Sequence, residues 1–247
     1  MKLLCLIILL ILTVRVSANQ TFIFAVPKYD PPYVMGGTPE VLEGFDINLV
    51  KEICSRLSWN CSFKRFAIPD LFGALFNNEA DYIIGGMVIT AERRQQFRFS
   101  LPYMICYGGF TTLKESPIHA PEDLLGKKVG IVKEREYGRY LSENFGNKFE
   151  LIPFDTYPDI FLALKNGQID AIFGNYYSLL FLQHQYPDEV NVLDVRYPVG
   201  EGLGIATLPA NEEQIKQINQ VLLQIQADGT FVKLYNYNFE FFINNTN

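Results

Sequence analysis

Short apolar runs and helical apolar periods alternate along this chain. Segments of strand length, most of them largely apolar, predict strands at residues 22–26, 61–66, 82–84, 128–132, 149–153 and 169–173. Helical spacing and helix-capping residues predict helices at residues 44–57, 69–76, 91–96, 137–144, 156–167 and 211–229. Regular alternation of strands and helices predicts an α/β fold built on parallel sheets.

Three of the predicted helices begin at recognisable capping residues. Thr90 precedes a short helical turn, and Thr is a preferred residue at the position before a helix. Thr156 is followed by Asp159 at the three-residue spacing of a reciprocal cap. Asn211 and Gln214 have the same spacing before the last helix, so both pairs predict where helices start.

The first 18 residues have the pattern of a cleavable export signal. Lys2 supplies a positive charge, residues 3–14 are apolar, and the VSA at 16–18 matches the small-x-small cleavage pattern. The apolar run is shorter than the roughly 20 residues that a membrane-spanning helix needs. The sequence therefore predicts an exported protein that is soluble after cleavage.

The charge balance excludes some partners. The formal net charge is −6, and loss of Lys2 and Arg15 with the signal would make it −8. A moderately acidic chain without basic clusters is a poor candidate for binding nucleic acid or anionic membranes. About 229 residues would remain, which is enough for one large domain or two of about 100 residues.

Signals of catalysis are weak. The two histidines, His119 and His184, belong to no metal-type or triad-type spacing, and no phosphate-binding glycine loop is present. Asp81 and Asp170 each precede an apolar strand, which favours a turn or capping role. The sequence therefore predicts no catalytic residue, no cofactor and no metal site.

Three cysteines follow the export signal. Cys54 and Cys61 lie at the end of a predicted helix and the start of the next strand. Export permits a disulfide between them, and two buried free thiols are the alternative. Cys106 has no evident partner and is expected to be a small buried residue.

The stretch at residues 81–103 organises the chain. A buried strand ends at two glycines, Gly86 being the second, and Arg93 follows in the next turn. In open α/β sheets ligands bind beyond the carboxyl ends of strands, and a planar guanidinium there suits a carboxylate. The alternative is that Arg93 is one of several surface arginines, together with Arg94 and Arg98.

Several motifs in order along the chain carry a family resemblance. They are GGMVIT-x-x-R at 85–93, FS-x-PY at 99–103, GFDINL at 44–49, DLLGKKVGIV at 123–132, NGQIDAIFGN at 166–175 and ADGTFVKLYN at 227–236. Together they resemble the family-3 extracellular solute-binding proteins, the polar amino-acid receptors of ABC importers. The resemblance covers essentially all of the chain after residue 20.

The resemblance implies a two-lobed periplasmic-binding-protein fold of type II. Residues 19–106 and 203–247 would form the first lobe, and residues 107–202 the second. The chain would cross between lobes near 105–112 and return near 197–204. Ligands of such proteins bind in the cleft, and the lobes close over them by a hinge motion.

The first-lobe ligand residues are transferred position by position from the family. The arginine of the family motif holds the α-carboxylate of the ligand, and Arg93 matches it. Gly86 and Val88 stand where main-chain groups meet the ligand, although a hydroxyl residue is common in place of Val88. Asp30 replaces a stacking aromatic, with Tyr33 close by. The last such position, Ile68, replaces another common aromatic residue.

The second lobe departs from the family pattern. Glu134, Arg135 and Glu136 stand where many relatives have a turn of small residues that binds the carboxylate. Asn175 replaces the aspartate that pairs with the α-ammonium, and an amide brings no negative charge. Either Asp30, Glu134 or Glu136 supplies that charge, or the ligand differs from a plain L-amino acid.

The resemblance predicts a monomeric periplasmic receptor that delivers a small polar molecule to an ABC permease of the inner membrane. The ligand is expected to be an amino acid, and the acids near the cleft favour a cationic one such as arginine or lysine. Receptors of the lysine/arginine/ornithine and histidine type imply a disulfide between Cys54 and Cys61. The alternatives are a dehydratase-like enzyme acting on a small carboxylate, and a sensor that presents its ligand to a membrane receptor.

Overall fold

The computed structural model describes residues 20–36 and 41–243. The predicted export signal at residues 1–18 lies outside the described residues. Within the described part of the chain, no helix combines the length and the apolar character needed to cross a membrane.

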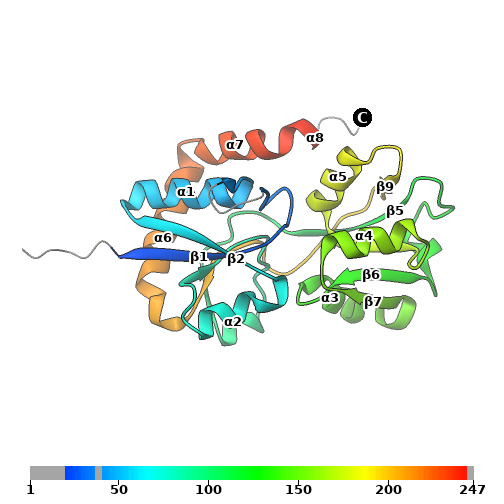
Figure 1. Ribbon diagram of the computed structural model, residues 1–247, viewed down its shortest axis with the longest axis horizontal. Helices are drawn as coiled ribbons and strands as arrows, with labels where there is room; N and C mark the ends of the chain where they lie inside the picture. The colour runs from blue at the N-terminus through cyan, green and yellow to red at the C-terminus, as the bar shows by residue number, and fades with distance from the viewer. Residues whose placement is uncertain (1–19, 37–40, 244–247) are drawn as a thin grey trace, which may run out of the picture.

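The first of two sheets contains the chain's earliest strands and one that returns late (Figure 1). In spatial order its strands are β2 (Asn60–Phe66), β1 (Thr21–Pro27), β3 (Tyr82–Ile83), β11 (Ala206–Thr207) and β4 (Arg98–Phe99). Strand β1 pairs in parallel with β2 and β3, as predicted. Strand β11 is antiparallel to β3 and β4, so the prediction of a purely parallel sheet is wrong at this edge. The chain re-enters the sheet there without a crossover helix.

The second sheet is also mixed. Its strands in order are β10 (Tyr197–Pro198), β5 (Tyr107–Leu113), β8 (Ala171–Asn175), β6 (Lys128–Val132) and β7 (Glu150–Phe154), and β9 (Val190–Val192) pairs with β5. Strand β6 is parallel to β7 and β8. Strand β5, by contrast, is antiparallel to β8, β9 and β10.

Helices flank each sheet and define two lobes (Figure 1). The first lobe carries α1 (Phe45–Leu57), η2 (Ile68–Asp70), α2 (Leu71–Phe76), η3 (Arg93–Gln95), η6 (Pro209–Asn211) and α6 (Glu212–Ala227). The second carries η4 (Pro121–Leu124), α3 (Glu136–Phe145), η5 (Gly146–Lys148), α4 (Tyr157–Lys165) and α5 (Tyr176–Gln185). The C-terminal helices are α7 (Thr230–Tyr235), η7 (Asn236–Glu240) and α8 (Phe241–Ile243). In Figure 1 they run from α1 toward α5, so they reach from the first lobe to the second.

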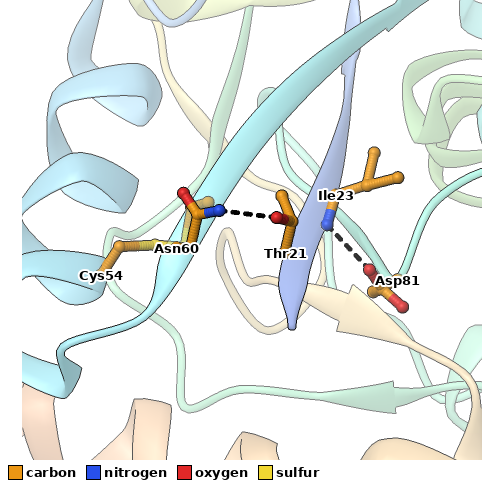
Figure 2. Close-up of a disulfide and its surroundings, with 6 residues drawn as sticks. Thr21, Ile23, Cys54, Asn60 and Asp81 are labelled. Atoms are coloured by element: carbon orange, nitrogen blue, oxygen red, sulfur yellow. Dashed lines mark hydrogen bonds between the residues drawn. A yellow bond between two sulfur atoms is a disulfide. The ribbon is translucent and has the colours of Figure 1, made fainter. Parts of the chain in front are cut away.

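A disulfide joins helix α1 to strand β2. Cys54 and Cys61 are bonded, with their Cα atoms 6.3 Å apart (Figure 2). The disulfide expectation is therefore confirmed over the alternative of two free thiols. The bridge anchors the helix, whose buried face includes Leu49 and Ile53, to the edge strand. Cys106 is a buried free thiol, as predicted.

In both lobes, an aspartate just before a strand accepts a hydrogen bond from the backbone of a neighbouring strand. An Asp81 carboxylate oxygen accepts a hydrogen bond from the Ile23 amide at 2.7 Å, just before β3 (Figure 2). In the second lobe Asp170 accepts one from the Lys128 amide at 2.8 Å, just before β8. Both carboxylates thus satisfy the backbone of a neighbouring strand, and the prediction of turn roles is confirmed.

The predicted helix caps give two different outcomes. Thr156 accepts a hydrogen bond from the Asp159 amide at 3.2 Å, as predicted. The pairing of Asn211 with Gln214 is wrong, because the Asn211 amide donates at 2.9 Å to the Thr207 hydroxyl on β11. Asn211 thus binds the neighbouring strand with its side chain, and α6 begins without a side-chain cap.

Three other elements differ from the sequence prediction. The turn at 91–96 forms only η3, although the Thr90 hydroxyl does accept from the Arg93 amide at 3.2 Å. The strand expected at 169–173 begins two residues later, because Asp170 is still in the preceding turn. Helix α5 was not predicted, because its buried residues 178–181 are consecutive and show no helical period.

Candidate ligand-binding site

A glycine turn forms the first-lobe floor of the cleft. Gly86 follows β3 with a φ of 57°, and a Cβ there would lie 3.0 Å from an Asp30 carboxylate oxygen. The Gly86 amide donates at 2.8 Å to the buried Asp46 carboxylate beneath it. Glycine is needed here because the conformation is left-handed and a charged group approaches closely. The turn leaves the carbonyl groups of Gly85 and Gly86 free to accept hydrogen bonds from the cleft.

Burial raises the pKa of the supporting Asp46 carboxyl to about 7. The Gly86 amide lowers that pKa, but less than burial raises it. The site floor therefore rests on a carboxyl group that is partly protonated near neutral pH.

Arg93 points into the cleft, unlike its neighbours. Its side chain is 12% exposed, whereas those of Arg94 and Arg98 are 41% and 42% exposed and pair with surface glutamates. The surface alternative therefore does not describe Arg93. Its guanidinium also lies over the Phe72 ring, 5.0 Å from the ring centre.

Each nitrogen of the Arg93 guanidinium has a partner. Nη1 donates to the Val88 carbonyl at 2.9 Å and Nη2 to the Glu134 carbonyl at 2.9 Å. Nε lies 2.9 Å from a Glu136 carboxylate oxygen. Glu134 and Glu136 belong to the second lobe, so Arg93 bridges the cleft. Burial lowers the pKa of Arg93, and the Glu136 carboxylate partly restores it.

Asp30 is buried and paired with an arginine of the second lobe. Its carboxylate accepts a hydrogen bond from Nη2 of Arg135. Nη1 of Arg135 donates to the Gly85 carbonyl at 2.8 Å and to the Gly86 carbonyl at 3.2 Å. Among the described residues, Nε of Arg135 has no hydrogen-bond partner. Burial raises the pKa of Asp30, and the Arg135 charge opposes that rise.

Glu136 is the first residue of α3. One carboxylate oxygen faces Arg93, and the other accepts a hydrogen bond from Arg139 on the same helix. Arg139 also pairs with Glu92 of the first lobe, at the mouth of the cleft. Burial raises the pKa of Glu136, and Arg93 opposes that rise.

Asn175 forms a separate polar contact between the lobes. Its carbonyl oxygen caps α5 by accepting from the Tyr177 and Ser178 amides at 3.0 and 3.2 Å. The same oxygen accepts from the buried Tyr33 hydroxyl at 3.1 Å, across the lobes. This cap was not predicted, because α5 itself was not predicted from the sequence.

The remaining predicted residues contribute backbone or packing. Val88 offers its carbonyl to Arg93 and pairs through its backbone with Leu203. Ile68 is buried in an apolar cluster with Val132 and Ile160 of the second lobe. The structure thus gathers Arg93, Asp30, Glu136 and the Gly86 and Val88 backbone in one charged region, with Tyr33, Asn175 and Ile68 around it.

Arg135 lies in the candidate site, and its place there was not predicted from the sequence. The sequence marks it only as a cation between two acids, in a turn where relatives carry small residues. Its burial arises from contact with Asp30, which is 105 positions away in the chain. A local pattern carries no information about such a distant contact.

Two cavities adjoin this region. One of ≈ 410 Å³ lies at the cleft mouth and is lined in part by Phe72, Arg93, Arg135 and Glu136. The other, of ≈ 580 Å³, lies between α4 and α5 and is mainly apolar. The candidate site is the first, because its walls carry the charges of both lobes.

The whole folded chain matches one protein family. The model of bacterial extracellular solute-binding proteins, family 3, matches residues 22–241. The chain belongs to this family. The resemblance drawn from the sequence motifs is therefore confirmed, as is the two-lobed type II fold.

This family-3 solute-binding protein is similar to several characterised proteins. It is 31% identical over 226 residues to the ABC transporter arginine-binding protein 1 of Escherichia coli (strain K12), covering 90% of this chain and 92% of that one. An arginine transport-system periplasmic binding protein from Legionella pneumophila matches with a TM-score of 0.83 and 36% identity, over 89% of this chain and 99% of that one. The GluR0 ligand-binding core from Nostoc punctiforme, in complex with L-glutamate, matches with a TM-score of 0.77 and 26% identity, over 88% and 99% of the two chains. The family and these relatives are binding proteins.

Proposed function

We propose that this protein is a periplasmic receptor that binds a cationic L-amino acid, such as arginine or lysine, and delivers it to an ABC permease of the inner membrane. The observation that carries the proposal is the pair of opposite charges on the first-lobe face of the cleft. Asp30 is buried there and the Arg93 side chain is 12% exposed, and both lie beside carbonyl groups of the glycine turn. The arginine-binding relatives support the choice of a cationic ligand.

The geometry suggests how each end of the ligand is held. The Arg93 guanidinium can grip the α-carboxylate with two parallel hydrogen bonds. Asp30 can pair with the cationic end of the ligand, while the Gly85 and Gly86 carbonyls accept further hydrogen bonds from it.

The finer organisation is part of the same proposal. The lobes divide at residues 106 and 203, with residues 19–106 and 203–247 in the first lobe and 107–202 in the second. The protein is exported to the periplasm with loss of residues 1–18, works as a monomer and binds its ligand without turnover. The division is supported by the two sheets, whose strands come from these separate ranges.

A sensing role is the second candidate. The likeness to the GluR0 ligand-binding core supports it, because that structure is named as a ligand-binding core and holds L-glutamate. An enzyme acting on a small carboxylate is the other alternative. Incubation with candidate carboxylates, followed by product analysis, separates a receptor from an enzyme because only an enzyme consumes its ligand.

Thermal unfolding in the presence of a ligand panel tests the proposal. The mature protein is scanned with each proteinogenic amino acid and with small dicarboxylates. A ligand at 100 times its Kd stabilises the folded state by about 2.7 kcal/mol, which raises the Tm measurably. We expect L-arginine or L-lysine to give the largest rise. A panel in which only dicarboxylates act, or no compound acts, contradicts the proposal.

A further inference from the structure

The two charges of the first-lobe face are already paired by the protein itself. Arg135 donates to Asp30, and Glu136 pairs with Arg93 at 2.9 Å. These two second-lobe residues are adjacent in the chain, at the start of α3. One short turn therefore presents a cation to the buried Asp30 and an anion to the partly buried Arg93.

Burial distinguishes these pairs from ordinary surface ion pairs. The Arg135 and Asp30 side chains are 3% and 2% exposed. On the same turn, Lys133 pairs with Asp155 at 2.9 Å, but both side chains are largely exposed. Exposed pairs contribute little, whereas breaking a buried pair leaves a charge without compensation. The two cleft pairs therefore resist separation unless another ion replaces the departing one.

The turn is shaped to reach across the cleft. Glu134 has a φ of 58°, an unusual left-handed conformation for a residue with a side chain. Its carbonyl accepts from Nη2 of Arg93 at 2.9 Å. Three consecutive residues of one turn thus contact the first lobe, two through side chains and one through its backbone. Strained backbone of this kind persists where the surrounding contacts hold it.

We infer that Arg135 and Glu136 are specificity-determining residues that act as a tethered ligand. This inference rests on the proposed function of the cleft. In the closed form they occupy Asp30 and Arg93, and a free ligand must displace both. The ligand class is therefore a small molecule that carries a carboxylate and a separate cationic group. A molecule with one charge replaces one partner and leaves the other pair in place, so the lobes stay joined.

A free ligand can pair with Asp30 in a better geometry than Arg135 does. Arg135 reaches Asp30 through Nη2, while its Nε is buried without a partner among the described residues. A free guanidinium can instead meet a carboxylate with two parallel hydrogen bonds. The tether has the advantage of high effective concentration, and the free ligand has the advantage of better geometry. Competition between them lowers the apparent affinity of the wild-type protein.

The test compares the wild-type mature protein with an Arg135→Ala/Glu136→Ala variant. Affinities for L-arginine and for agmatine, which lacks the carboxylate, are measured by calorimetry. Small-angle scattering without ligand gives the radius of gyration. Lys133→Ala is the matched control, because it removes a charge from the same turn without touching the first lobe. An Arg135→Gln/Glu136→Gln variant, which keeps side-chain length more closely, provides a second folded protein if the alanine variant unfolds.

We expect the double variant to have a larger radius of gyration without ligand and to bind L-arginine more tightly. A tethered form that outnumbers the free form by about ten to one weakens the apparent affinity about tenfold, so relief restores about that factor. Agmatine should bind the wild-type protein far more weakly than L-arginine, and the control should match the wild type throughout.

Three results overturn the inference. They are an unchanged radius of gyration in both double variants, weaker arginine binding by them, and agmatine binding to wild type as tight as that of arginine. Weaker binding would make Arg135 and Glu136 direct ligand contacts instead. If no amino acid binds any variant, the proposed function fails. The scattering comparison then still decides whether the turn holds the lobes closed.

Discussion

The lobes are joined by contacts of opposite chemistry on the two sides of the molecule. On one side, the polar contact consists of Arg135 and Glu136 paired with Asp30 and Arg93. On the other, the aromatic contact consists of rings of the C-terminal helices against α5. Its ring pairs are Phe181 with Phe242 at 5.7 Å, Tyr177 with Phe239 at 5.3 Å and His184 with Phe241 at 5.3 Å. In Figure 1, α2 and α3 lie low in the view, beside the polar contact. Helices α7 and α8 of the C-terminal segment lie high, on the side of the aromatic contact.

The difference indicates which contact a ligand can exchange. Each charge of the polar contact has a chemical equivalent in an amino acid, so a ligand can replace it without leaving a buried charge unpaired. The rings of the aromatic contact have no such equivalent in a small polar molecule. Apolar burial is also non-directional and tolerates small rotations better than hydrogen bonds do. We therefore expect opening at the polar contact, with the aromatic contact kept as a fixed side.

Removal of a ring should break the aromatic contact with the largest effect on stability. Phe242 is 1% exposed and packs against Phe181 and Phe239. We expect Phe242→Ala to lower the free energy of unfolding by about 3–5 kcal/mol, the usual cost of truncating a buried Phe. Urea unfolding measures it, with the exposed Tyr237→Ala as control. A loss below about 1 kcal/mol would show that the aromatic contact does not hold the lobes.

Arg93→Ala should have the largest effect on ligand binding. It removes the guanidinium that we propose grips the carboxylate of the ligand, and we expect at least about a 100-fold loss of affinity, or about 3 kcal/mol. Arg93→Lys should also bind poorly, because a point charge cannot reproduce the fork. Calorimetry measures the loss, and Arg94→Ala on the exposed side is the control.

The contacts of Arg93 also change the stability expected of this variant. From sequence alone, Arg93→Ala is expected to cost little stability. The structure adds a buried Glu136 that loses its cross-lobe partner, so a cost of about 1–3 kcal/mol is now expected. Near-normal affinity in a folded Arg93→Ala protein would remove Arg93 from the site.

The pH dependence of stability should separate the two contacts further, because the polar side rests on Asp46, a buried carboxyl group whose pKa is raised by burial. Asp46 has a pKa of about 7, well above its ordinary value of 3.8. Between these two pH values the folded protein keeps a proton that the unfolded chain has lost. Its contribution to stability is therefore fully present below about pH 4 and is lost as the pH rises toward 7.

Asp46→Asn should remove this part of the pH dependence. Its side-chain oxygen can still accept from the Gly86 amide, so the turn keeps its support. We expect the variant to gain about 4 kcal/mol relative to wild type between pH 4 and pH 8, measured by urea unfolding across that range. Parallel pH curves for the two proteins would show that Asp46 has an ordinary pKa.

The sequence predicted the first-lobe half of the site better than the second. Arg93, Gly86 and the turn between them follow a buried strand directly, so local pattern and family motif agree on their place. In the second lobe, Arg135 acquires its role from Asp30, a contact that no local period encodes. Asn175 was read as a ligand residue because its family position was known, while its capping of α5 was not.

The elements of the fold also divide into those that a local sequence pattern predicts and those that it does not. Strands and amphipathic helices that repeat a period were predicted, often within a residue or two of their observed ends. Helix α5 has consecutive buried residues, so it carries no period to detect. The antiparallel return of β11 depends on where the chain re-enters the first sheet, which the alternation of elements does not specify.

Asn175→Asp gives the smallest expected effect and tests the link that lies behind both contacts. The cap of α5 should survive, because Asp is as good a capping residue as Asn and also favours the positive end of a helix. If the ligand is an L-α-amino acid whose ammonium reaches this point, affinity should rise by up to about 1–2 kcal/mol, and Asp30→Asn should lower it. Calorimetry with L-arginine gives the sign.

A weaker affinity would mean that the natural ligand lacks an ammonium there, because the new carboxylate would be buried without a partner. A change near zero would assign Asn175 wholly to its cap and its Tyr33 hydrogen bond, and the second-lobe side of the site would then consist of the polar contact alone.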